Sequence, residues 1–213
     1  MNPQDVCRET FRICQIAPVI SVLTVNNARK AVRLANALVK GGLPVLEVTL
    51  RTPVALKAIR AMSKVEGSVV GAGTLLTPAD VHAAKGAGAA FGVSPGATER
   101  LLSAAEMEGL PLIPGSATAS EAMRLLERGY TVQKFFPAAA SGGAPALKAL
   151  AAPLPQIKFC PTGGITLRNA GDYLALENTI CVGGSWVAPD GLVTRGRWKD
   201  IEARARKAAS LGG

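Results

Sequence analysis

Two charged residues stand inside short apolar runs of this chain, where a purely structural strand would avoid them. Glu47 lies in the run Val45–Leu50, and Lys134 lies in the run Val132–Phe136. Burying a carboxylate or an ammonium group without a partner is costly, so such a residue either finds a partner or does chemistry. A lysine amine can attack a ketone to form an imine, and a carboxylate can move the protons that this reaction requires. The two residues together predict carbonyl chemistry through a Schiff base.

A third charged group belongs to the same predicted strand as Glu47. In an extended strand Glu47, Thr49 and Arg51 share one face, and the apolar residues between them share the other. We therefore expect the carboxylate and the Arg51 guanidinium to point into the fold together, where the guanidinium would bind the carboxylate of a keto acid. Two structural alternatives remain open, because Glu47 could form a buried ion pair with Arg51 or with Lys134 that serves only the fold.

Two glycine pairs follow the last two predicted strands and indicate an anion site. The segments are Pro161-Thr162-Gly163-Gly164-Ile165 and Val182-Gly183-Gly184-Ser185-Trp186. Glycine lets the backbone approach an anion closely, and the N–H groups at the start of a helix can donate to it. The loops after the seventh and eighth strands of a barrel are the usual place for a phosphate. We expect a phosphate site here, with simple turns as the alternative.

Eight short apolar runs, each flanked by glycine or proline, predict eight strands. They are Pro18–Leu23, Val45–Leu50, Ser68–Ala72, Ala89–Val93, Leu112–Pro114, Val132–Phe136, Ile157–Pro161 and Thr179–Val182. Helical patterns lie between these runs, with apolar residues at three- and four-residue spacing and often with a glycine at the end. They include Ala28–Lys40, Pro53–Met62, Pro78–Lys85, Thr98–Glu108 and Ser120–Arg128.

This alternation of strand and helix predicts an α/β protein built as a (β/α)8 TIM barrel. A doubly wound open sheet is the alternative, because alternation alone does not show that the sheet closes. An extra N-terminal helix over roughly Pro3–Ile13 could cover the bottom of the barrel. The length of 213 residues, with no low-complexity linker, predicts a single domain over residues 1–213.

Barrels carry their chemistry at the C-terminal ends of their strands, so polar residues there are further candidates. Thr74 follows the third predicted strand and could donate a hydrogen bond to a substrate carboxylate. Ser94 and Pro95 follow the fourth strand and could shape the wall of a pocket. Both segments could equally be turns. Lys158 begins the seventh strand, and we expect it to reach solvent near the bottom of the barrel.

The charge distribution argues against two classes of partner. The net charge is +9, but the basic residues are scattered except near the C-terminus, and they are not interleaved with aromatic side chains. We therefore expect no nucleic acid as a partner. The charged N-terminus lacks the apolar segment of a signal peptide, and no apolar run approaches the length of a membrane span. These features predict a cytoplasmic protein that does not contact a membrane.

The cysteines and the single histidine do not form a predicted site. The four cysteines form no C-x-x-C pair, and we expect Cys160 and Cys181 to be small buried apolar side chains. His82 is the only histidine, and it lies on the predicted exterior of a helix. We therefore expect neither a metal site nor a Ser-His-Asp triad.

Five segments of the chain together carry a family resemblance. They are Glu47-Val48-Thr49-Leu50-Arg51-Thr52, Gly71-Ala72-Gly73-Thr74, Lys134-Phe135-Phe136-Pro137, Pro161-Thr162-Gly163-Gly164-Ile165 and Gly183-Gly184-Ser185-Trp186. In this order they resemble the 2-keto-3-deoxy-6-phosphogluconate (KDPG) aldolases of the Entner–Doudoroff pathway, a class I aldolase family whose relatives also cleave 4-hydroxy-2-oxoglutarate (KHG). The resemblance covers nearly the whole chain.

The resemblance implies a phosphorylated keto acid as substrate, cleaved into pyruvate and D-glyceraldehyde 3-phosphate. It implies that Lys134 forms the Schiff base, that Glu47 is the general acid/base, and that Arg51 and Thr74 hold the carboxylate of pyruvate. The residues that would line the pocket and the phosphate end are Pro95, Phe136, Thr162, Gly163, Gly164, Gly184 and Ser185. Members of the family are typically homotrimers and need no metal or other cofactor.

One segment departs from the family pattern. Many relatives follow the Lys-Phe-Phe-Pro run with Ala-Glu, whereas this chain has Ala138-Ala139-Ala140, which puts a local contact in doubt but not the lysine. The galactonate epimer of the phosphorylated substrate and unphosphorylated KHG remain alternative substrates. An isomerase or epimerase without a Schiff base would need a metal cluster or a second acid/base group opposite Glu47, and the sequence offers neither.

Overall fold

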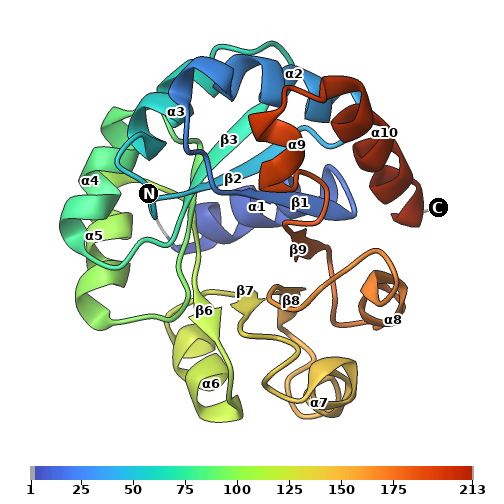
Figure 1. Ribbon diagram of the computed structural model, residues 1–213. Coiled ribbons are helices and arrows are strands. Elements are labelled where there is room, and N and C mark those ends of the chain that lie inside the picture. The colour runs from blue at the N-terminus through green and yellow to red at the C-terminus, as the bar shows by residue number, and fades with distance from the viewer. Residues whose placement is uncertain (1–2, 213) are drawn as a thin grey trace.

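The computed structural model describes residues 3–212, in which parallel strands alternate with helices (Figure 1). The strands are β1 Val19–Leu23, β2 Val45–Thr49, β3 Val69–Gly73, β4 Phe91–Val93, β5 Leu112–Ile113, β6 Gly115–Ser116, β7 Val132–Phe135, β8 Lys158–Pro161 and β9 Val182–Gly184. The helices are α1 Pro3–Gln15, α2 Ala31–Lys40, α3 Ala55–Met62, α4 Pro78–Gly86, α5 Glu99–Glu108, α6 Ala119–Glu127, α7 Gly143–Ala149, α8 Ala170–Leu174, α9 Asp190–Thr194 and α10 Trp198–Ala209, with 3-10 turns η1 at Ala28–Lys30 and η2 at Ser210–Gly212.

The strands form two parallel sheets that curl around a common interior. One sheet has the order β5-β4-β3-β2-β1-β9, and the other has the order β6-β7-β8. Isolated parallel bridges join Phe159 to Thr179 and Thr162 to Gly183, so β8 also runs beside the segment that contains β9. Figure 1 shows most of the helices on the outside of this curled half-barrel. The C-terminal ends of the strands therefore gather at one end of the molecule.

The predicted strands agree with the observed ones except at the fifth and the eighth. The fifth predicted run, Leu112–Pro114, contains β5, and β6 follows beyond its end. The two strands are separated at Pro114 because proline has no N–H to donate to a neighbouring strand. Its carbonyl still accepts a hydrogen bond of 2.8 Å from the N–H of Lys134. The eighth strand, β9, begins only at Val182 and extends to Gly184, beyond the predicted Thr179–Val182.

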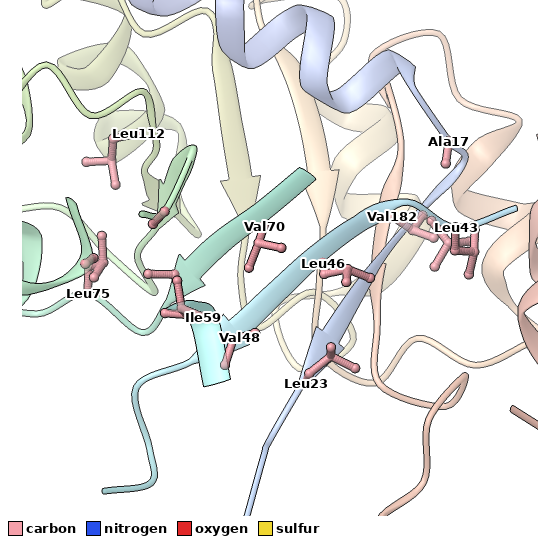
Figure 2. Packing of buried hydrophobic residues seen from close by; sticks show 14 of the residues in the cluster. Ala17, Leu23, Leu43, Leu46, Val48, Ile59, Val70, Leu75, Leu112 and Val182 are labelled. Carbon is pink, nitrogen blue, oxygen red and sulfur yellow. The ribbon is translucent and has the colours of Figure 1, made fainter. Parts of the chain in front are cut away.

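The apolar side chains divide into an outer and an inner cluster, as the strand alternation predicts. Leu46 and Val48 of β2 pack with Ile59 of α3 in the outer cluster, between the sheet and the helices (Figure 2). Val45, on the other face of β2, belongs to the inner cluster. Glu47 shares that face, because it stands two residues further along the strand. The sheet thus directs the carboxylate inward.

The inner cluster combines apolar residues of α1 with apolar residues of the strands. Its members are Ile13, Cys14, Ile20, Val45, Phe91, Val93, Ile113, Val132, Cys160 and Cys181. Ile13 and Cys14 come from the last turn of α1 and are fully buried.

Among the described residues, no helix is both long and apolar enough to cross a bilayer.

Candidate active site

Lys134 of β7 and Glu47 of β2 meet inside the curled sheet. The Nζ atom of Lys134 lies 3.3 Å from Oε1 of Glu47, and the two side chains are only 7% and 3% exposed. This contact confirms that both residues face the same interior. The two strands belong to different sheets, so the pair spans the space between them. An ion pair of purely structural purpose would have the same geometry, and the surroundings of the pair therefore decide what it can do.

Glycine leaves the space that the Glu47 carboxylate occupies. Gly73 of β3 lies beside Thr49 of β2, and a Cβ atom on Gly73 would collide with Oε1 of Glu47. Any other residue at position 73 would displace the carboxylate from Lys134. The sequence motif Gly71-Ala72-Gly73-Thr74 thus has a steric purpose at its third position.

Phe136 connects the Lys134–Glu47 pair to a cavity at the C-terminal ends of the strands. The Nζ atom of Lys134 lies 5.1 Å from the centre of the Phe136 ring. The same residue lines a cavity of about 150 Å³. The lining residues are Val22, Arg51, Phe136, Thr162, Gly163, Gly164, Ile165, Gly183 and Ser185. The structure therefore brings together five of the predicted binding residues from the segments that follow β2, β7 and β8, with Ser185 as a sixth from the segment that follows β9.

Arg51 lies at the rim of this cavity rather than inside the fold. Strand β2 ends at Thr49, so the alternation that directs Glu47 inward no longer applies to Arg51, and its side chain is exposed. The expectation that Arg51 points into the interior beside Glu47 is wrong for this reason. Its Nε donates to Oγ1 of Thr49 over 3.1 Å, and its Nη2 donates to Oγ1 of Thr24 over 2.9 Å. Within the described range no carboxylate pairs with Arg51, so its charge is available to an anionic ligand.

The loop after β8 combines occupied carbonyl groups with free N–H groups. The carbonyls of residues 162–164 accept hydrogen bonds of 2.8, 3.0 and 3.0 Å from the N–H groups of Ala138 and Ala139 and from Nδ2 of Asn169, respectively. The N–H groups of Gly164 and Ile165 donate to no acceptor in the part of the chain that the structure describes. A run of unpaired backbone donors beside a cavity favours an anion.

Both glycines of this loop are required by the backbone. Gly163 and Gly164 have φ of 99° and 76°, a left-handed conformation that side chains disfavour. A Cβ atom on Gly164 would also collide with Cβ of Ala139. Ala139 is therefore in contact with the glycine loop.

The second glycine pair serves the packing of the site. A Cβ atom on Gly183 would collide with the Thr162 hydroxyl, so this glycine makes room for a residue of the cavity wall. Gly184 lies within β9 against the ring of Trp186 and is not part of the cavity lining.

Thr74 and Pro95 also lie outside the cavity lining. Thr74 directly follows Gly73 and has a φ of 62°, which a β-branched residue rarely adopts. Strained backbone of this kind concentrates at functional sites, so Thr74 stays a candidate. Pro95 packs against the backbone of Gly115, where a Cβ atom would collide with the Pro95 carbonyl.

The cysteines and His82 do not line the cavity of this site. Cys160 and Cys181 are 4% and 0% exposed, which confirms that they are buried. Hydrogen bonds with Cys14 and Cys160 raise the pKa of Cys181 well above its ordinary value. His82 is on the surface, where its Nδ1 lies 2.9 Å from Oε1 of Glu108. The described residues contain no group of three or more His, Cys, Asp or Glu side chains suited to a metal ion.

Two residues of the site were not found from the sequence. Val22 lines the cavity, and Thr24 holds Arg51. Thr24 could have been found, because it is a polar residue directly after the first predicted strand, which is the position that the barrel rule singles out. The apolar Val22 carries no such signal.

Known proteins of one enzyme family match most of this chain. A family model described as KDPG and KHG aldolase matches residues 11–204. The 2-dehydro-3-deoxy-phosphogluconate aldolase of Dickeya dadantii is 48% identical over 200 residues, which are 93% of this chain and 94% of that protein. The KHG/KDPG aldolase of Escherichia coli is 49% identical over 197 residues, which are 92% of each chain.

Two solved structures have a closely similar fold. The 2-keto-3-deoxy-6-phosphogluconate aldolase of Zymomonas mobilis with 3-phosphoglycerate has a TM-score of 0.91 and 45% identity, over 96% of this chain and 97% of that one. The KDPG aldolase of Legionella pneumophila, with pyruvate captured at low pH as a covalent carbinolamine intermediate, has a TM-score of 0.91 and 46% identity, over 93% of this chain and 97% of that one.

Proposed function

Because this chain belongs to the KDPG and KHG aldolase family, we propose that it cleaves 2-dehydro-3-deoxy-6-phosphogluconate into pyruvate and D-glyceraldehyde 3-phosphate through a lysine Schiff base. The family resemblance read from the sequence is thereby confirmed. The observation that carries the proposal is the buried Lys134–Glu47 pair, which stands beside a cavity lined by an arginine and a glycine loop. An amine, a carboxylate and an anion site are the groups that aldol cleavage of a phosphorylated keto acid requires.

The reaction begins with a proton transfer within the pair. Passing one proton from Lys134 to Glu47 over the 3.3 Å contact gives a neutral amine and a neutral acid. The amine attacks the C2 ketone of the substrate and forms a carbinolamine. Loss of water, with a proton from the acid, gives an iminium ion on Lys134. The carbinolamine captured in the Legionella pneumophila enzyme supports this step.

During carbon–carbon cleavage Glu47 first accepts a proton and later returns one. Glu47 takes the proton of the C4 hydroxyl group while the C3–C4 bond breaks. The electron pair of that bond moves into the iminium ion. The products are D-glyceraldehyde 3-phosphate and the enamine of pyruvate on Lys134. Glu47 then returns a proton to C3, and water hydrolyses the resulting imine to free pyruvate. One carboxylate suffices because its acid and base roles alternate.

The remaining residues hold the two anionic ends of the substrate. We assign the carboxylate of pyruvate to Arg51, which has no internal acidic partner among the described residues, with Thr74 as a further donor. We assign the phosphate to the free N–H groups of Gly164 and Ile165, together with Thr162 and Ser185 of the cavity lining and the neighbouring Gly184. Phe136 and Pro95 would form walls of the pocket. The 3-phosphoglycerate in the Zymomonas mobilis structure supports a phosphate site in this fold.

A second substrate is favoured by one comparison. The Escherichia coli relative is named a KHG/KDPG aldolase, and we propose that this chain also cleaves 4-hydroxy-2-oxoglutarate, with lower efficiency because that substrate has no phosphate to fix its position.

We extend the proposal to the architecture and the assembly. The bridges between β8 and the β9 segment support a closed (β/α)8 barrel, with β5 and β6 as one interrupted strand and α1 across its bottom. We further propose a single catalytic domain, a cytoplasmic homotrimer, and no nucleic-acid or membrane partner.

The direct test is the release of pyruvate from the phosphorylated keto acid by the purified chain. We expect a turnover within the usual enzymatic range of about 1–1000 per second. The same keto acid without its phosphate should lose kcat as well as affinity, because binding of the distant phosphate orients the reacting bond. Coupling pyruvate release to lactate dehydrogenase measures both substrates, and failure to release pyruvate from either keto acid would refute the proposed function.

Replacement of Gly73 by alanine tests whether the position of the carboxylate matters. The new Cβ atom would collide with Oε1 of Glu47 and displace it from Lys134. We expect kcat to fall by up to about 100-fold, because an error of about 1 Å in a catalytic group can cost that much. Gly86→Ala is the matched control, since no atom lies within 4 Å of a Cβ at that position of α4. Wild-type kcat in the Gly73 variant would show that the carboxylate tolerates displacement.

A further inference from the structure

Arg51 is held by two hydroxyl groups from neighbouring strands. Thr49 is the last residue of β2, and Thr24 directly follows β1, which pairs with β2 in parallel. Each hydroxyl accepts from a different nitrogen of the guanidinium, over 3.1 Å from Nε and 2.9 Å from Nη2. The planar guanidinium is thereby fixed on one edge, and the rest of its donors remain for a ligand.

The hydroxyl of Thr49 is itself oriented. It donates its proton to the carbonyl of Leu23 over 2.9 Å, so its lone pairs are left for the Arg51 Nε–H. Thr49 is only 2% exposed, which protects this arrangement from competing water. The hydrogen bonds therefore all point one way, because Arg51 at the rim of the cavity donates to Thr49 and Thr49 donates to the buried carbonyl of Leu23 in β1.

From this arrangement we propose that Thr49 and Thr24 are positioning residues, which hold the Arg51 guanidinium in the orientation that binds the carboxylate of the keto acid. The inference rests on the proposed function. Both partners are neutral, so they fix Arg51 without cancelling its charge. An aspartate or a glutamate in their place would cancel it. An unrestrained arginine at an exposed rim would lose rotamer entropy when the substrate binds. The two hydroxyl groups already order the Arg51 side chain in the free protein, so less entropy is lost on binding.

The chain offers a matched control for these contacts. Thr52 donates its hydroxyl proton to the carbonyl of Val25 over 2.7 Å, in the same region between the ends of β1 and β2. This bond resembles that of Thr49 to Leu23, but in the described structure Thr52 forms no hydrogen bond with the guanidinium. Thr52→Val therefore removes a comparable hydroxyl–carbonyl bond and leaves Arg51 held.

The experiment is reductive trapping of pyruvate by borohydride, with protein mass as the readout and the half-saturating pyruvate concentration as the measured quantity. Thr49→Val and Thr24→Val should each raise this concentration about tenfold, because hydrogen bonds to charged groups are among the stronger ones. Thr49→Ser should restore the wild-type value, and Thr52→Val should keep it. The Thr24 side chain is exposed, so its variant tests the proposal even where the buried Thr49 variant folds poorly.

The decisive arm adds both changes to Arg51→Met. If the threonines act only through Arg51, Thr24→Val and Thr49→Val have no further effect in that background, because the effects of coupled residues do not add. Additive effects, or Thr24→Val with wild-type half-saturation, would overturn the proposal. A wild-type protein that traps no pyruvate would instead refute the Schiff-base function itself, so the two failures are distinguishable.

Discussion

Replacement of Lys134 by methionine should abolish aldol cleavage and the covalent trapping of pyruvate. Methionine keeps an unbranched side chain of similar length but has no amine, so no carbinolamine can form. Borohydride and pyruvate should add mass to the wild-type protein at a peptide that contains Lys134 and should add none to the variant. We expect the residual cleavage rate to fall below the detection limit of the coupled assay.

Lys158 provides the matched control for this experiment. It is the other lysine in a strand, at the start of β8, and its Nζ donates to the carbonyl of Glu177 at the opposite end of the strand from the cavity. Lys158→Met should retain both cleavage and trapping. Thermal unfolding of both variants checks the fold, because Lys134→Met leaves the Glu47 carboxylate buried without its partner. Covalent trapping of pyruvate by a folded Lys134 variant would refute the assignment of the lysine.

Replacement of Glu47 by glutamine should separate imine formation from proton transfer. Glutamine has nearly the same shape and can still form hydrogen bonds in the space that Gly73 leaves, but it cannot accept the C4 proton. We expect kcat to fall by about 10²–10⁴-fold, the usual contribution of general acid–base catalysis, while pyruvate is still trapped on Lys134. Steady-state cleavage and borohydride trapping on the same sample measure the two effects.

A carboxylate outside the site gives the comparison for this change. Glu106 accepts two hydrogen bonds from Arg128, which lower its pKa below the ordinary value, and it also accepts one from Tyr130. Glu106→Gln removes a hydrogen-bonded carboxylate of structural purpose and should keep wild-type turnover. A Glu47→Gln variant with wild-type turnover would remove Glu47 from the mechanism and leave the Lys134–Glu47 contact a structural ion pair.

The sequence predicted the centre of the site better than its rim. Within a strand, alternation fixes the face on which each side chain lies. The sequence alone therefore assigns Glu47 and Lys134 to the interior of the fold. Arg51 stands two residues beyond the end of β2, where alternation no longer holds, and its side chain is exposed instead of buried. Thr24 was missed because its contact with Arg51 depends on the pairing of β1 with β2, which a single sequence does not display.

The same distinction applies to the strands themselves. Glycine and proline at the flanks located six of the eight predicted runs within a few residues, including the two that contain Glu47 and Lys134. The interruption at Pro114 is a local effect of the missing N–H and could have been predicted from the proline alone. The position of β9 depends on its parallel partner β1, so its boundaries followed from tertiary pairing rather than from local composition.

The two members of the reactive pair come from different sheets and are 87 residues apart in the chain. The buried pair therefore exists only where both sheets are folded against one another, and a molecule that lacks either sheet has no enclosed amine beside a carboxylate with which to attack a ketone.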